Sequence, residues 1–141
     1  MKRKKSLHIL VVENHQDTLD AMKMFLDLRG HITETASTMK AALDAAADNA
    51  FDLVITDIGL PDGDGWEWMR QLRERGPVRA VAMSGYGWKE DLEKSRAAGF
   101  EAHLLKPLKI TELENVLRKM EQSSGADAPK RSRRKAAAVA A

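Results

Sequence analysis

The chain of 141 residues contains no cysteine. This absence excludes a disulfide framework, a cysteine nucleophile and any metal site built on thiolates. Aromatic residues make up only 5% of the chain, so the hydrophobic core must consist mainly of aliphatic and methionine side chains. No apolar run approaches the roughly 20 residues that span a membrane. The run Leu7–Val12 follows a basic start but lacks a small-residue cleavage site, so we expect a strand rather than a signal peptide, and a cytoplasmic protein.

Charge is unevenly distributed along the chain. The formal net charge is +2, but nine of the 23 basic residues lie in segments 2–5 and 130–135, which contain no acidic residue. The 14 other basic residues are outnumbered by 21 acidic ones, so the part of the chain between these segments has a net charge of −7. The positive charge therefore belongs to the two ends, and a nucleic-acid-binding face spread over a folded domain is disfavoured.

Short apolar runs alternate with longer amphipathic segments five times along the chain. The runs lack strict polar–apolar alternation, which is typical of strands covered on both faces of a parallel sheet. The predicted strands are Leu7–Val12, His31–Thr35, Leu53–Thr56, Val78–Met83 and Ala102–Leu105. The predicted helices cover residues 16–29, 38–48, 64–75, 88–98 and 109–122. We therefore expect an α/β protein with a doubly wound, five-stranded parallel sheet and helices on both faces.

The composition divides the chain into three parts. Residues 1–5 form a basic N-terminal extension, and residues 6–122 form one domain. After residue 122 the sequence turns rich in small residues, then basic, then alanine-rich, which predicts a disordered tail over 123–141. Three interpretations of the basic ends stay open: they are solvated and inert, they attract nucleic acid or anionic lipid non-specifically, or they dock on an acidic partner.

Polar side chains follow four of the predicted strands at the points where the strands end. Glu13 and Asn14 follow the first strand, Asp57 ends the third, and Ser84 and Lys106 follow the fourth and fifth. The carboxyl ends of parallel strands meet at one edge of a sheet, so these side chains should converge. No glycine-rich loop follows the first strand, which excludes dinucleotide and P-loop sites. A carboxylate nucleophile beside an ammonium group and oxygen ligands for a hard cation instead favours a phosphoryl site.

Four motifs, in this order, resemble those of the receiver domain of response regulators in two-component signalling. The motifs are Ile9–Glu13, Asp52–Gly65, Met83–Gly85 and His103–Pro107. The resemblance covers about residues 6–122 and implies a flavodoxin-like (βα)5 fold. It implies a phosphoprotein that receives a phosphoryl group from a histidine kinase or a histidine phosphotransfer protein of a phosphorelay. It also implies a downstream protein that reads the surface formed by the fourth helix, the fifth strand and the fifth helix.

The resemblance assigns a role to each residue at the predicted sheet edge. Asp57 matches the phosphoacceptor, Lys106 matches the lysine that pairs with the phosphoryl group, and Ser84 matches the hydroxyl that moves toward it. The positions that match ligands of Mg²⁺ are Glu13, Asn14, Asp57 and the Gly59 carbonyl. The Lys106–Pro107 bond matches a cis peptide of the family. Such a domain is a switch and not an enzyme, apart from Mg²⁺-dependent labelling by small phosphate donors and self-dephosphorylation.

Two positions depart from the family pattern. The family has two acids after the first strand, and here the second is Asn14, which offers a neutral oxygen and no charge. The site then has two carboxylates where three are usual, so we expect weakened Mg²⁺ binding. His103 occupies the position of a switch residue that is usually Tyr or Phe. It is either a switch residue here too or a surface histidine with no such role.

Two alternative functions stay open from the sequence. The first is a pseudo-receiver, an interaction module that is not phosphorylated because Asn14 replaces an acidic metal ligand. The second is a nucleic-acid or membrane-associated adaptor that acts through the basic tails. Trp66 and Trp68 cannot share one helical face, so we expect at least one of them to be exposed or near the site loop.

Overall fold

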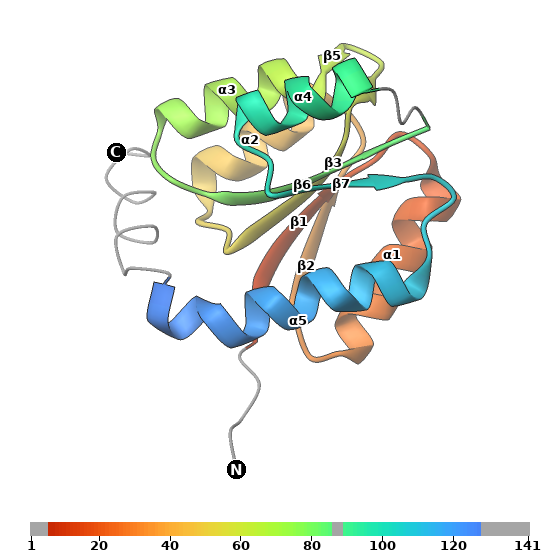
Figure 1. Cartoon of the computed structure of the whole chain (residues 1–141), viewed down its shortest axis with the longest axis vertical. Coiled ribbons are helices and arrows are strands. Elements are labelled where there is room, and N and C mark those ends of the chain that lie inside the picture. The colour runs from red at the N-terminus through yellow and green to blue at the C-terminus, as the bar shows by residue number, and fades with distance from the viewer. Residues whose placement is uncertain (1–5, 86–88, 128–141) are drawn as a thin grey trace.

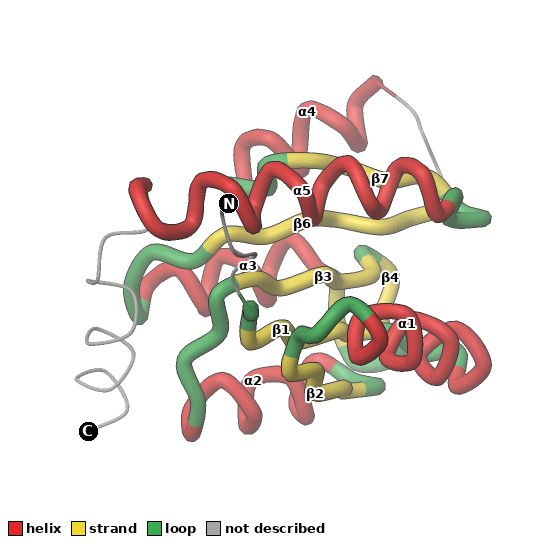
Figure 2. The backbone as a smooth tube through the Cα atoms, turned by 90° about the horizontal axis from the view of Figure 1, so that it is seen from below, coloured by secondary structure: helices red, strands yellow, loops and turns green. Residues whose placement is uncertain are grey.

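The structure is a computed structural model that describes residues 6–85 and 89–127, with side chains as far as residue 122. Its main sheet is parallel and has the strand order β2-β1-β3-β6-β7 (Figure 2). The strands are β1 (His8–Val12), β2 (Ile32–Ala36), β3 (Leu53–Asp57), β6 (Arg79–Ser84) and β7 (Ala102–Leu105). A small antiparallel pair, β4 (Gly59–Leu60) with β5 (Gly63–Asp64), lies in the loop after β3 and was not predicted.

Helices cover both faces of the sheet (Figure 1). The helices of one face are α1 (Gln16–Leu28) and α5 (Ile110–Asp127). Those of the other face are α2 (Met39–Asp48), α3 (Gly65–Glu74) and α4 (Lys89–Ala98). The predicted fold class, a doubly wound five-stranded parallel sheet, is confirmed. In the described part of the chain, no helix is long and apolar enough to cross a membrane.

Two hydrophobic cores lie on either side of the sheet because successive strand residues point to opposite faces. Ile9 and Val11 of β1 pack with α1 and α5, while Leu10 and Val12 pack with α2 and α3. All four side chains are fully buried. This burial on both faces explains why the strands read as continuous apolar runs.

The observed elements lie close to the predicted ones, with one clear difference at the last helix. Gly30 and Gly99 end α1 and α4 with φ angles of 93° and 104°, which is a conformation that glycine adopts easily. Helix α5 continues to Asp127, five residues beyond the predicted end of this helix at residue 122. The helix ends two residues before Pro129, which disfavours helical backbone in the residue before it. The basic segments 1–5 and 128–141 lie outside the described residues.

A buried polar cluster fastens α5 to the start of the sheet. The backbone N–H of Leu7 donates to Nδ1 of His31 at 3.0 Å, so the ring hydrogen is on Nε2. Nε2 then donates to Oε2 of Glu121 at 2.7 Å, and Arg29 Nη2 donates to both Glu121 oxygens at 3.1 and 3.2 Å. The side chains of His31 and Glu121 are only 1% and 3% exposed. The sequence pattern gave no sign of this cluster, because its members are far apart in the chain.

Replacing Glu121 by alanine should destabilise the protein by about 3 kcal/mol, because it leaves the Arg29 guanidinium and the His31 N–H without their buried acceptor. Urea unfolding of the full chain measures this loss. The exposed neighbour Gln122, replaced by alanine, is the matched control and should change stability by less than about 0.5 kcal/mol. Equal losses of stability for the two variants would show that Glu121 contributes no more to stability than an exposed residue does.

Candidate functional site

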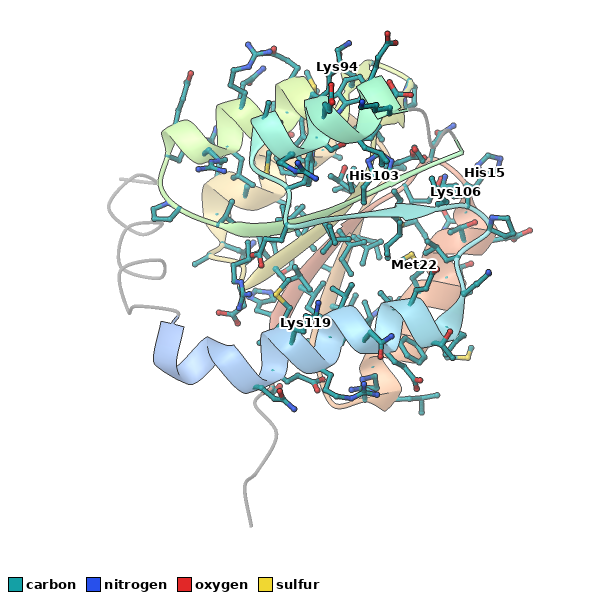
Figure 3. The ribbon with its side chains drawn as sticks, in the orientation of Figure 1. His15, Met22, Lys94, His103, Lys106 and Lys119 are labelled. Carbon is teal, nitrogen blue, oxygen red and sulfur yellow. The ribbon has the colours of Figure 1, made fainter. Side chains whose placement is uncertain are left out.

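The carboxyl ends of β1, β3 and β7 bring three of the predicted site residues together. The Lys106 ammonium lies 2.7 Å from Asp57 Oδ2 and 2.6 Å from Glu13 Oε1. β1 and β3 are neighbours in the sheet, and β7 is separated from β3 only by β6. Figure 3 shows Lys106 at this end of the sheet, near His15. One cation therefore bridges the two carboxylates that the sequence placed at this edge. The Lys106–Pro107 peptide is cis, as predicted.

Backbone groups hold the two acids in place. Glu13 is fully buried, and its Oε2 accepts a hydrogen bond from the N–H of His15 at 3.0 Å. Its other oxygen, Oε1, accepts no hydrogen bond of good geometry within the described residues and is compensated by the Lys106 charge. Asp57 is 8% exposed, and among the described residues its Oδ1 accepts only a long hydrogen bond, from the N–H of Gly59 at 3.3 Å. Each acid thus keeps one oxygen with little hydrogen bonding.

The pKa values of the three groups shift in different directions. For Asp57, burial has the largest effect and raises the pKa, and the nearby Glu13 charge adds to this against the opposing effect of Lys106. For Glu13, burial also acts to raise the pKa, but the contact with the Lys106 ammonium and the hydrogen bond from the His15 N–H outweigh it, and the pKa is lowered. For Lys106, burial acts to lower the pKa, but the two carboxylates outweigh it, and the pKa is raised.

The loop after β3 is fixed by contacts that involve Gly65 and Asp62. A Cβ atom at Gly65 would lie 2.6 Å from the carbonyl oxygen of Asp57, so this position requires glycine. The Asp62 carboxylate accepts hydrogen bonds from the N–H groups of Met39 and Lys40 at 2.7 and 2.9 Å. These bonds satisfy free donors at the start of α2 and lower the pKa of Asp62. The loop that carries Gly59 is therefore anchored at both ends.

The donor atoms at this edge fit a hard divalent cation of the Mg²⁺ type. The candidates are carboxylate, carbonyl and amide oxygens, from Glu13, Asp57, Gly59 and Asn14. The Glu13 carboxylate is buried, and its Oε1 has the Lys106 ammonium as its charge partner at 2.6 Å. The Asn14 side chain is exposed. Among residues 6–85 and 89–127, no three His, Cys, Asp or Glu side chains gather as a metal site, so this donor set has lower charge than three acids would give.

Ser84 and His103 lie beside this edge and contact each other. Oγ of Ser84, at the end of β6, lies 2.7 Å from Nε2 of His103. The other ring nitrogen, Nδ1, lies 2.8 Å from Oγ of Ser95 in α4. The half-buried ring is thus hydrogen-bonded at both nitrogens. Ser95 was not singled out from the sequence, because a serine in the middle of a polar helix carries no signal of its contacts.

The two tryptophans of α3 have different environments, as expected from their spacing. Trp68 is fully buried and donates a hydrogen bond to Thr56 Oγ1 at 3.1 Å. Trp66 is half-buried at the boundary between α3 and α4, with the Lys94 ammonium 4.6 Å from its ring centroid. Trp66 is therefore the partly exposed member of the pair.

Comparison with known proteins identifies the family of this fold and site. The model of the response regulator receiver domain matches residues 9–118, and the chain belongs to this family. The chain is 35% identical over 111 residues to the KDP operon transcriptional regulatory protein KdpE of Escherichia coli, covering 79% of this chain and 49% of KdpE. It spans about half the length of that relative. It is 32% identical over 110 residues to an uncharacterised 14.6 kDa protein of Leptolyngbya boryana, covering 76% of this chain and 84% of that protein.

Solved structures agree with this assignment. The CheY-like receiver domain of Methylobacillus flagellatus is 31% identical, with a TM-score of 0.74 over 83% of this chain and 100% of that one. The receiver domain of Ssk1 from Saccharomyces cerevisiae, crystallised with the histidine phosphotransfer protein Ypd1, shares the fold at 19% identity, with a TM-score of 0.82 over 89% of this chain and 96% of that one. Receiver domains interact with histidine kinases or phosphotransfer proteins and generally bind Mg²⁺ at their acidic pocket.

The opposite pKa shifts of Asp57 and Glu13 predict opposite effects of neutral substitutions at pH 7. The raised pKa of Asp57 means that its ionised form costs stability in the folded protein, so Asp57→Asn should raise the melting temperature. The lowered pKa of Glu13 means that its ionised form contributes stability, which is lost as the pH falls through the folded-state pKa, so Glu13→Gln should lower it.

Thermal unfolding of the two variants and the unchanged protein tests these signs. The gain from Asp57→Asn should shrink as the pH falls and the Asp57 carboxyl group of the unchanged protein becomes protonated. Shifts of the same sign for both variants at pH 7 would contradict the description of the site.

Proposed function

We propose that this chain is a phospho-accepting receiver that takes a phosphoryl group onto Asp57 from a histidine kinase or a histidine phosphotransfer protein and thereby switches the binding of a partner. The observation that carries the proposal is the Asp57 carboxylate at the end of β3, 2.7 Å from the Lys106 ammonium and beside buried Glu13. The chain acts as a switch and not as an enzyme that turns over a substrate, with at most slow self-labelling and self-dephosphorylation.

The two oxygens of Asp57 have different roles in this proposal. Oδ2 is held by Lys106, whereas Oδ1 has a long 3.3 Å bond from Gly59 within the described part of the chain and is the more weakly held nucleophile. Oδ1 forms the new bond to phosphorus as the bond from phosphorus to the donor's histidine nitrogen breaks, and the electron pair leaves with that nitrogen. Lys106 then pairs with the phosphoryl oxygens, and the Ser84 hydroxyl donates to another of them.

Magnesium is the cofactor of this proposal. Glu13, Asp57 and the Gly59 carbonyl would hold the ion, with Asn14 in the place of a second acid. The bound ion would neutralise charge on the incoming phosphoryl group. The binding is weakened by the neutral amide at Asn14, because carboxylate number tunes the affinity for hard cations.

An apolar groove on this chain lies beside Asp57 and is the docking site for the phosphodonor in this proposal. The groove lies between α1 and the segment after β7 and has a volume of about 630 Å³. Its lining combines the apolar side chains of Met22, Phe25, Leu108 and Ile110 with Lys106 of the site. Figure 3 shows Met22 on the same side of the molecule as Lys106. A helix that carries a phosphohistidine could pack here with its phosphoryl group directed to Asp57.

The output surface is a different one, formed by α4, β7 and α5. Leu92 of α4 and Leu105 of β7 are 37% and 46% exposed, so large apolar side chains are available on this side. Ser84 and His103 lie under it, which supports a downstream protein that reads a change at this surface. The partner is expected to bind differently once Ser84 bonds to the phosphoryl group.

Two other candidate functions differ in their support. A pseudo-receiver that binds partners without phosphorylation is favoured by Asn14 and by the presence of only two carboxylates at the site. An adaptor that binds nucleic acid or membranes through basic tails rests on segments that lie outside the described residues, so the folded part offers no observation in its favour.

Incubation of the full chain with acetyl phosphate and Mg²⁺ should add the mass of one phosphoryl group, measured on the intact protein. Asp57→Asn removes the nucleophile and should abolish the gain while keeping the fold, checked by circular dichroism. Labelling that persists in this variant would assign the acceptor elsewhere. No labelling of the unchanged protein at high Mg²⁺ would favour the pseudo-receiver.

Asn14→Asp should tighten Mg²⁺ binding by roughly tenfold, about 1.4 kcal/mol, because it restores one anionic ligand. The same change should raise the labelling rate by acetyl phosphate at limiting Mg²⁺. A magnesium titration followed by tryptophan fluorescence measures the affinity, and Asp17→Asn on the exposed start of α1 is a control for a change of one charge nearby. Affinity and rate unchanged in Asn14→Asp would mean that position 14 does not reach the ion.

A further inference from the structure

A chain of side-chain hydrogen bonds runs from the site to α3. Ser84 Oγ lies 2.7 Å from His103 Nε2, and His103 Nδ1 lies 2.8 Å from Ser95 Oγ. Ser95 Oγ also accepts a hydrogen bond from Trp66 Nε1 at 2.9 Å. The four residues come from β6, β7, α4 and α3. The acceptor site is thereby connected to the helical layer above it, where Figure 3 shows His103 beneath α4.

The two serines of this hydrogen-bond chain are sheltered from water. Ser84 and Ser95 are 5% and 2% exposed. His103 points into this layer because Ala102 and Leu104, its neighbours in β7, pack on the opposite face of the sheet. Buried polar groups are nearly always hydrogen-bonded, so each hydroxyl and ring nitrogen here must have a definite role as donor or acceptor.

With a neutral His103 ring, the hydrogen bonds among these four residues can run in two directions. The Trp66 indole can only donate, so Ser95 accepts from it. A neutral imidazole has one donor and one acceptor nitrogen, and a hydroxyl has one proton. Either Ser95 donates to Nδ1 and Nε2 donates to Ser84, or Nδ1 donates to Ser95 and Ser84 donates to Nε2. In the second arrangement the single proton of Ser84 is used by His103.

A phosphoryl group on Asp57 selects between these directions. Its oxygens are acceptors, so Ser84 must turn its only proton toward them. While Ser84 stays in contact with a neutral His103 ring, Nε2 carries the ring hydrogen and Nδ1 accepts from Ser95. All hydrogens then point the same way, from Trp66 through Ser95, His103 and Ser84 to the phosphoryl oxygen.

We propose that Ser95 and Trp66 are positioning residues for the phosphoryl group, because they hold His103 as the tautomer with hydrogen on Nε2 and so leave the Ser84 proton free for the phosphoryl oxygen. The inference rests on the proposed function of Asp57. It deepens that function by naming the residues that set the direction of the Ser84 hydroxyl.

These hydrogen bonds also connect the phosphorylated site to the protein surface at Trp66. Trp66 and Lys94 line a cleft of about 840 Å³ between α3 and α4, with the Lys94 ammonium above the indole ring. A change in the hydrogen bond from Trp66 to Ser95 therefore changes the lining of this cleft. The indole N–H of Trp66 becomes a natural reporter of the state of Asp57.

Nitrogen-15 NMR of the full chain tests the proposal in the presence of excess acetyl phosphate and Mg²⁺. Intact mass measured on the same samples shows whether Asp57 is labelled. In the labelled protein, the His103 signals should be those of a neutral ring with hydrogen on Nε2, and the Trp66 indole signal, assigned with Trp66→Phe, should move on labelling. Asp57→Asn should show neither change under the same conditions.

Substitutions at Ser95 separate positioning from simple packing. Ser95→Ala removes the donor to Nδ1, so it should lose the single tautomer, lose the Trp66 response and slow labelling by about fivefold, the effect of one neutral hydrogen bond. Ser95→Thr keeps the hydroxyl and should restore all three. Trp66→Phe removes only the indole donor and should weaken the tautomer preference while the protein stays folded.

The outcomes distinguish this proposal from the function on which it rests. A labelled protein in which Nδ1 carries the His103 hydrogen, or in which Ser95→Ala leaves the ring signals and the labelling rate unchanged, overturns the positioning role alone. A protein that is never labelled overturns the proposed function and this inference with it.

Discussion

The site depends on one constraint: the Lys106 ammonium must lie between two buried carboxylates that come from different strands. Glu13 at the end of β1 and Asp57 at the end of β3 would repel each other without a cation, because both are removed from water. Lys106 at the end of β7 supplies that cation at 2.6 and 2.7 Å. The strand order β2-β1-β3-β6-β7 makes this contact possible, since it places the three strand ends at one edge of the sheet.

The two departures from the family pattern affect different parts of the same site: one affects the cation ligands and the other affects the contacts of Ser84. Asn14 lowers the negative charge available to a cation. His103 replaces an apolar or phenolic ring by one that bonds at both nitrogens, so the ring takes part in a polar chain with Ser84 and Ser95. The two hydroxyls hold the position of the ring, and the ring hydrogen can lie on either nitrogen.

Much of the fold and the site could be predicted because strand ends and helix ends are marked locally in the sequence. The apolar runs gave β1, β3, β6 and β7 closely, and the residues after them were the ones that meet at the sheet edge. What the sequence did not reveal depends on distances between separate elements: the contact of Ser95 in α4 with His103, the cap that Asp62 gives to α2, and the contact of His31 with Glu121. The predicted end of α5 at residue 122 lies before the observed end at Asp127, because small and polar residues are typical of linkers but do not prevent helical hydrogen bonding.

The central claim is that Asp57 itself forms an acyl phosphate, and chemical trapping tests it most directly. Borohydride reduces an aspartyl phosphate to homoserine, so peptide mass spectrometry after labelling and reduction reads the modified position. The account predicts homoserine at position 57 and at no other aspartate. Homoserine at another aspartate, or a stable phosphate on Ser84 with Asp57 unmodified, would contradict it.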